Sequence, residues 1–110
     1  MNIQGIYGME LDGHTLNKYF STLVDRIYKI LPMRENGEKT LSVYMESLLC
    51  ELGGFKELFE AISNDTGYLT ILSILQYLRK HPRLPVYVVK REIFRAISVC
   101  KMLREQYGEE

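Results

Sequence analysis

The sequence predicts an all-α, four-helix bundle-like single domain with an irregular strap at its N-terminus. Apolar residues recur at alternating spacings of three and four along most of the chain, which is the period of a helix with one buried face. The segments between these patterns are short and carry glycine, proline or capping residues, which favours antiparallel neighbouring helices. A length of 110 residues suits one domain with one core.

The first 31 residues divide into two parts. Glycines interrupt the apolar residues of 1–13, which predicts an irregular strap whose apolar side chains dock on the bundle. A helix is expected over 15–31, and Pro32 is expected to end it because proline lacks the N–H and clashes with the preceding turn. The apolar stripe of this helix consists of Leu16, Tyr19, Phe20, Leu23, Val24, Ile27, Ile30 and Leu31.

A second helix is expected over 40–63, with Thr40 as its N-cap. Its pattern crosses Gly53-Gly54, and each glycine in a helix interior costs roughly 1 kcal/mol relative to alanine. The apolar phase is nevertheless unbroken, which favours one helix bent at 53–54 over two separate helices. The residues that keep this phase at intervals of seven are Leu41, Leu48, Phe55 and Ile62.

The third and fourth helices are expected over 67–80 and 86–107. The third is apolar nearly all round, which is typical of a helix buried on most sides. The fourth follows Pro85, a favoured residue at a helix start. Its apolar seam repeats as a heptad and consists of Val86, Val89, Ile93, Ala96, Cys100, Leu103 and Tyr107.

Charge is divided unevenly along the chain. Residues 79–104 hold eight of the fourteen basic residues and one acid, Glu92, whereas residues 1–78 hold six bases and ten acids. The formal net charge of the whole chain is zero. A surface with charge of one sign attracts a partner of the opposite sign, so this asymmetry indicates an interaction surface on the last helix.

Beside its seam, the last helix carries a second row of residues in which aromatic and basic side chains alternate. Arginine and tyrosine are enriched in protein interfaces, and no catalytic motif accompanies them. We therefore expect a non-enzymatic protein-interaction or assembly module, whose partner is another protein or a second copy of the chain. The candidate partner-binding residues are Tyr87, Lys90, Arg91, Phe94, Arg95 and Lys101.

Two other interpretations compete with this one. Residues 67–107 have the outline of a helix-turn-helix, although the usual turn glycine is missing and the net charge is zero, so nucleic-acid binding is the alternative function. In the second interpretation, acids of the same chain neutralise the basic row, and its two aromatic residues belong to a wide core stripe. The acids that would neutralise it lie on the second helix: Glu46, Glu51, Glu57 and Glu60.

Motifs for enzymatic chemistry do not stand out in the sequence. His14 and His81 have no metal-ligand spacing to other residues, and Gly53-Gly54 is not followed by the lysine of a phosphate loop. No cofactor, metal site or small-molecule substrate is therefore expected. Cys50 and Cys100 are expected to be reduced, each on an apolar helical face. The sequence shows neither a secretory signal nor a membrane span, so we expect a cytoplasmic protein with no membrane partner.

Overall fold

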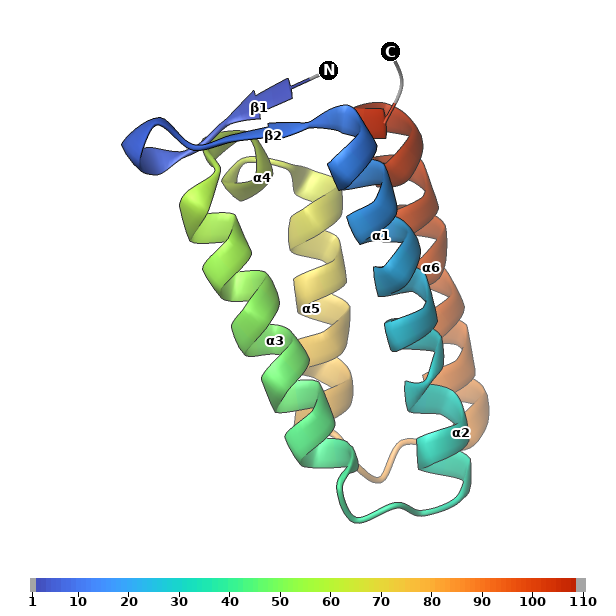
Figure 1. Cartoon of the computed structure of the whole chain (residues 1–110). Helices are drawn as coiled ribbons and strands as arrows, with labels where there is room; N and C mark the ends of the chain where they lie inside the picture. Colours follow the sequence, from blue (N-terminus) through green and yellow to red (C-terminus); the bar gives the residue numbers. More distant parts are fainter. Residues whose placement is uncertain (1, 109–110) are drawn as a thin grey trace.

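A computed structural model describes residues 2–108 of the chain. Four long helices run along one axis, and a small hairpin lies across one end of them (Figure 1). The predicted all-α, bundle-like fold is confirmed. The elements in chain order are β1 (Asn2–Gln4), a 3-10 turn (Ile6–Gly8), β2 (Glu10–Asp12), α1 (Gly13–Tyr28), α2 (Ile30–Glu35), α3 (Leu41–Leu58), α4 (Glu60–Ser63), α5 (Thr66–Lys80) and α6 (Val86–Gly108).

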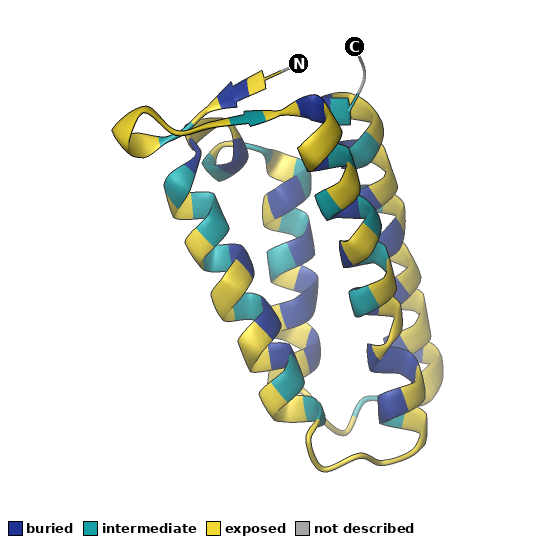
Figure 2. Cartoon of the chain, in the orientation of Figure 1, coloured by how far each residue is buried: buried dark blue, intermediate teal, exposed yellow. Residues whose placement is uncertain are grey.

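The core lies between the inward faces of the long helices, as the burial colours in Figure 2 show. Helix α6 packs between α1 and α5, and α3 packs on α5 from the other side. As a result α3 and α6 occupy opposite edges of the bundle in Figure 1. Of the predicted seam of α6, all members except Val86 are buried. The seam therefore faces the core along almost the whole helix.

The N-terminal segment docks on the bundle as expected, but it is a short hairpin and not an irregular strap. Its two three-residue strands pair antiparallel, with Ile3 opposite Leu11. Ile3 is buried, whereas Ile6, Tyr7 and Met9 at the tip are exposed. Alternation along a strand sends only every second side chain towards the bundle, so docking is limited to one side of the hairpin.

The first helix ends three residues before its expected end. Helix α1 stops at Tyr28, and Pro32 lies in the first turn of α2 instead of ending a helix. Proline has no N–H for the carbonyl four residues back, which is that of Tyr28, so the regular bonding fails at this point. Proline is well tolerated in a first helical turn, where an N–H has no intrahelical partner. A new short helix therefore begins where the old one breaks.

The second long helix runs through Gly53 and Gly54 as one helix, as expected, but it ends at Leu58 and not at 63. The backbone of Phe59 is extended, with φ −134° and ψ 113°. It forms a β-bridge with Gly5 of the hairpin, and its side chain is buried. A contact with the distant N-terminus thus sets the end of α3. At the other end of α3, Thr40 holds the N-cap position but makes no capping hydrogen bond through its side chain.

Replacing Gly53 by alanine is expected to raise the free energy of unfolding by up to about 1 kcal/mol, because alanine favours the helix. A Cβ there would meet no atom within 4 Å. Gly5→Ala is the opposite case, since its Cβ would lie 2.7 Å from the Leu58 carbonyl oxygen. This variant should lose about 1–3 kcal/mol through overpacking. Urea unfolding followed by circular dichroism measures both, and a loss of stability in Gly53→Ala would contradict the expectation.

Helix α5 is less completely covered than its composition suggests. Asp65 caps it by accepting a hydrogen bond from the Tyr68 amide at 3.0 Å. Its inward residues, among them Ile71 and Leu75, are buried, but Leu69 and Tyr77 are exposed. Neighbours cover α5 on the sides of α3 and α6 and leave an outer side open to solvent.

Candidate partner-binding face

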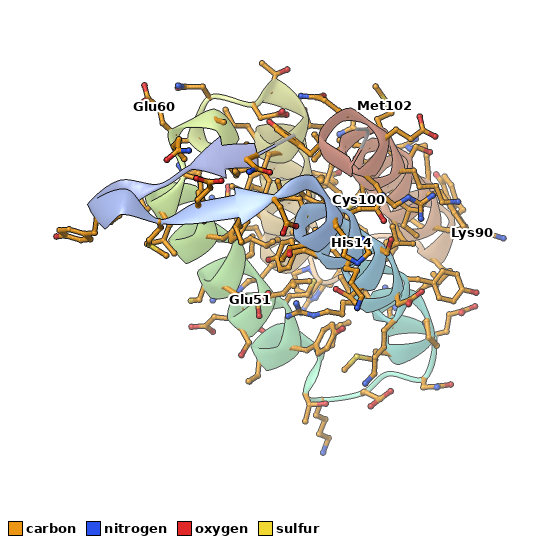
Figure 3. The ribbon with its side chains drawn as sticks, turned by 45° about the horizontal axis from the view of Figure 1, so that its top comes forward. His14, Glu51, Glu60, Lys90, Cys100 and Met102 are labelled. Atoms are coloured by element: carbon orange, nitrogen blue, oxygen red, sulfur yellow. The ribbon has the colours of Figure 1, made fainter. Side chains whose placement is uncertain are left out.

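The six residues predicted to bind a partner are all exposed on α6, and we refer to them as the basic-aromatic stripe: Tyr87, Lys90, Arg91, Phe94, Arg95 and Lys101. Their spacing places them outside the buried seam of the helix. Figure 3 shows the labelled Lys90 projecting outward from α6. The structure therefore makes these side chains accessible, but it does not gather all six at one point.

The aromatic members of the stripe are not part of the core. The exposed fractions of Tyr87 and Phe94 are 72% and 43%. Phe94 contacts Tyr28 of α1 edge to face, with ring centroids 6.2 Å apart, and Tyr28 is itself 49% exposed. Two large aromatic rings from neighbouring helices thus meet at the surface.

Tyr28 is not among the residues that the sequence pattern singles out. It follows the buried Ile27 directly and lies off the predicted apolar stripe of α1. An aromatic residue at such a position is itself a signal, because aromatic side chains are enriched in interfaces. The signal becomes specific only when the structure brings Tyr28 beside Phe94.

The two arginines of the stripe bind an acid of their own helix. Arg91 Nε lies 3.3 Å from one carboxylate oxygen of Glu92, and Arg95 Nη2 lies 3.2 Å from the other. Glu92 is almost fully buried, and burying a carboxylate is costly unless it is paired and hydrogen-bonded. Lys90 and Lys101 make no ion pair within residues 2–108. The lysines are therefore the members of the stripe that are left to interact with a partner.

The interpretation in which the acids of the second helix neutralise the stripe is wrong for its two arginines. Glu51 of α3 binds Arg26 of α1, with Oε2 2.6 Å from Nη1, and it accepts a hydrogen bond from Tyr19. The bond from Arg26 holds the pKa of Glu51 below its usual value. Glu46 binds Arg79 at 3.2 Å. Because α3 lies across the bundle from α6, its acids reach α1 and α5 (Figure 1).

The two helices of the proposed helix-turn-helix run antiparallel, side by side, along the long axis of the bundle (Figure 1). A helix-turn-helix requires two helices that cross at roughly 90–120°, so that the second can enter the major groove. Residues 67–107 therefore do not form this motif. Nucleic-acid binding through the charge of the stripe alone is a separate hypothesis, which stays a prediction.

Other chemical features give little further indication of function. The two cysteines are free, but Cys50 is exposed and not on a buried face as expected. Burial raises the pKa of the Cys100 thiol to about 12, so this thiol is inert at neutral pH. In the described part of the chain, no cluster of three or more histidine, cysteine or acidic side chains is suited to holding a metal ion.

Residues 2–108 contain no helix with the length and apolar character needed to cross a membrane. Comparisons of the chain with protein-family models, with curated proteins and with solved structures gave no match. Any functional argument therefore rests on the surface of this chain itself.

Proposed function

We propose that this protein is a non-enzymatic interaction module that binds an acidic surface of a protein partner through α6. The observation that carries the proposal is the exposed contact between Phe94 and Tyr28. Lys90 lies about one turn and Lys101 about two turns along α6 from Phe94, and neither lysine has an ion-pair partner among residues 2–108. Tyr87 extends the aromatic surface towards the start of α6.

The chemistry of this face suits a protein partner. Burying exposed aromatic rings supplies most of the favourable free energy of an interface, whereas charges at its rim steer the approach and select the partner. The lysines would supply that rim, and they favour a carboxylate-rich surface. Because the chain as a whole is neutral and α3 carries acids, a second copy of the chain is one partner of this kind.

A photo-crosslinking amino acid placed at position 94 tests the proposal. We expect a specific crosslink to one protein or to a second copy, and we expect Lys90→Glu with Lys101→Glu to abolish it. The lysines are chosen because reversing Arg91 or Arg95 would remove one of the two ion-pair partners of Glu92 and place a like charge beside it. The same crosslinker at Met102, which is 66% exposed on α6 and lies outside the stripe, is the matched control.

The outcomes separate the interpretations. Sedimentation equilibrium distinguishes self-association from binding of another protein. Crosslinks of equal yield from positions 94 and 102 would argue against a specific face, and so would a crosslink that survives the double charge reversal.

Nucleic-acid binding remains the alternative, because bases interleaved with exposed aromatic rings also hold a polyanion and stack on planar groups. Its signature is an affinity that falls steeply with salt, since each neutralised phosphate releases counterions. Retention of DNA or RNA at about 0.15 M salt that is lost in the double lysine variant, with no protein crosslink from position 94, would favour this alternative over our proposal.

A further inference from the structure

The end of the bundle opposite the hairpin contains a cavity of about 500 Å³. It lies where α2 leads into α3 and α5 leads into α6, at the lower end of Figure 1. Its floor is apolar and is formed by residues of four different helices. The floor residues are Ile30, Met33, Met45, Leu78 and Val89, all of which are buried.

The rim of the cavity is basic. Four bases line it, together with His81 and one acid, Glu38. Two of the bases have partners within the chain: Arg34 donates a hydrogen bond to the Leu84 carbonyl at 2.6 Å, and Arg79 binds Glu46. The other two bases, Lys39 and Arg83, make no ion pair or side-chain hydrogen bond within residues 2–108.

The start of α3 adds to the positive potential at this rim. Leu41 and Ser42, the first residues of α3, line the cavity. The Leu41 amide donates a hydrogen bond to the Glu38 carbonyl at 3.3 Å, and no side chain caps the helix. Uncapped first-turn N–H groups and the helix dipole both favour a nearby anion. Bases in the last turn of a helix, such as Arg79 and Lys80 of α5, stabilise that helix through its dipole. Lys39 and Arg83 lie outside α5, so this role does not account for them.

We propose that this cavity binds a small amphipathic anion, namely an apolar group that carries one carboxylate. The apolar floor would take the hydrocarbon part, and Lys39 and Arg83 would hold the carboxylate at the rim. A concave apolar site with a few convergent polar groups is the usual form of a small-molecule pocket. The site is distinct from the basic-aromatic stripe, and its test does not depend on the proposed function.

Octanoate is a suitable probe, and methionine-methyl NMR of the intact protein is the measurement. Met33 and Met45 line the cavity, whereas Met9 lies in the hairpin and Met102 on the outer face of α6. We expect octanoate to shift the methyl signals of Met33 and Met45 saturably and to leave those of Met9 and Met102 in place. No shift, or equal shifts of all four methyl groups, would overturn the proposal.

Selectivity for the anionic head is tested with 1-octanol, which has the same chain without the charge. We expect the alcohol to bind at least about tenfold more weakly, because it lacks the charge-assisted hydrogen bonds to the rim. Equal affinities would show that the site is merely apolar and would overturn the proposed ligand class. Binding to vesicles that contain anionic lipid, without binding of free octanoate, would also overturn it.

The rim is tested with Lys39→Ala combined with Arg83→Ala, two exposed positions whose change leaves the core intact. We expect octanoate to bind about tenfold more weakly to this variant. The matched control is Lys80→Ala, which removes a base beside Arg79 that does not line the cavity. An unchanged affinity in the double variant, or an equal loss in the control, would contradict the assignment of the rim.

Discussion

Truncating Leu75 to alanine is expected to lower the free energy of unfolding by about 2–5 kcal/mol. Leu75 is completely buried in the middle of α5, and α5 contacts both α3 and α6. Removing its side chain deletes apolar contacts and leaves a cavity that a closely packed core refills only in part. Urea unfolding followed by the helical circular dichroism signal measures this loss.

Leu69→Ala is the matched control, because it makes the same chemical change on the same helix at a position that is 38% exposed. Its cost should be clearly smaller, since much of its side chain is already in water. Similar losses at both positions would mean that the outer side of α5 is covered in solution, for example by a second copy. A negligible loss at Leu75 would contradict the packing described here.

The helices could be predicted because their patterns are local. The seam of α6 repeats three-four over three heptads, and a buried face of that period is a property of one segment by itself. The same holds for α1, whose buried residues include Leu16, Phe20, Leu23 and Ile27. The exposure of the basic-aromatic stripe follows from the same periodicity, because its members lie outside the seam.

Breaks that depend on distant residues could not be predicted in this way. Phe59 leaves the helix because it pairs with Gly5, which is far away in sequence. The strands of the hairpin are only three residues long, too short for an alternating pattern to stand out against the glycines. Pro32 is compatible both with a helix end and with a first turn, and sequence alone does not choose between them.

The difference between local patterns and contacts between distant residues also applies to the two candidate sites. Whether the acids of α3 reach the stripe depends on which edge of the bundle α3 occupies, and that is a matter of topology. The cavity at the end of the bundle is assembled from segments between Ile30 and Val89, so no single stretch of sequence marks it. In the sequence, Arg79 and Arg83 were simply part of a basic region.

Raising the pH above about 9 is expected to unfold the protein progressively, because buried groups resist ionisation in the folded state. Burial raises the pKa of the Cys100 thiol to about 12 and moves the pKa of the Tyr68 phenol well above its usual value. Burial and the hydrogen bond to Asp65 also raise the pKa of Tyr107, whose hydroxyl lies 2.7 Å from the Asp65 carboxylate.

Proton linkage determines whether stability rises or falls with pH. An unfolded thiol or phenol loses its proton above about 8.5 or 10, respectively, whereas the folded groups keep theirs. The folded state then binds more protons than the unfolded state, so stability falls as pH rises. The stability that each group contributes is fully present below its unfolded pKa and is lost as the pH rises from that value to the raised pKa of the folded state. Each such group costs about 1.4 kcal/mol per pH unit, so Cys100 and Tyr68 together should cost about 3 kcal/mol per unit above pH 10.

Urea midpoints measured from pH 7 to pH 11 test this expectation, with tyrosinate absorbance as an independent reading of ionisation. Tyr68→Phe removes one titrating group and keeps the ring, which packs near Phe20 and Phe55. Its stability should therefore fall less steeply above pH 10 than that of the unchanged protein. At pH 7 this variant should lose about 1 kcal/mol, because the hydrogen bond from the Tyr68 hydroxyl to the Leu52 carbonyl is gone. Equal slopes in the two proteins, or tyrosines that all ionise near pH 10 while the helices persist, would show that Tyr68 is not buried as described.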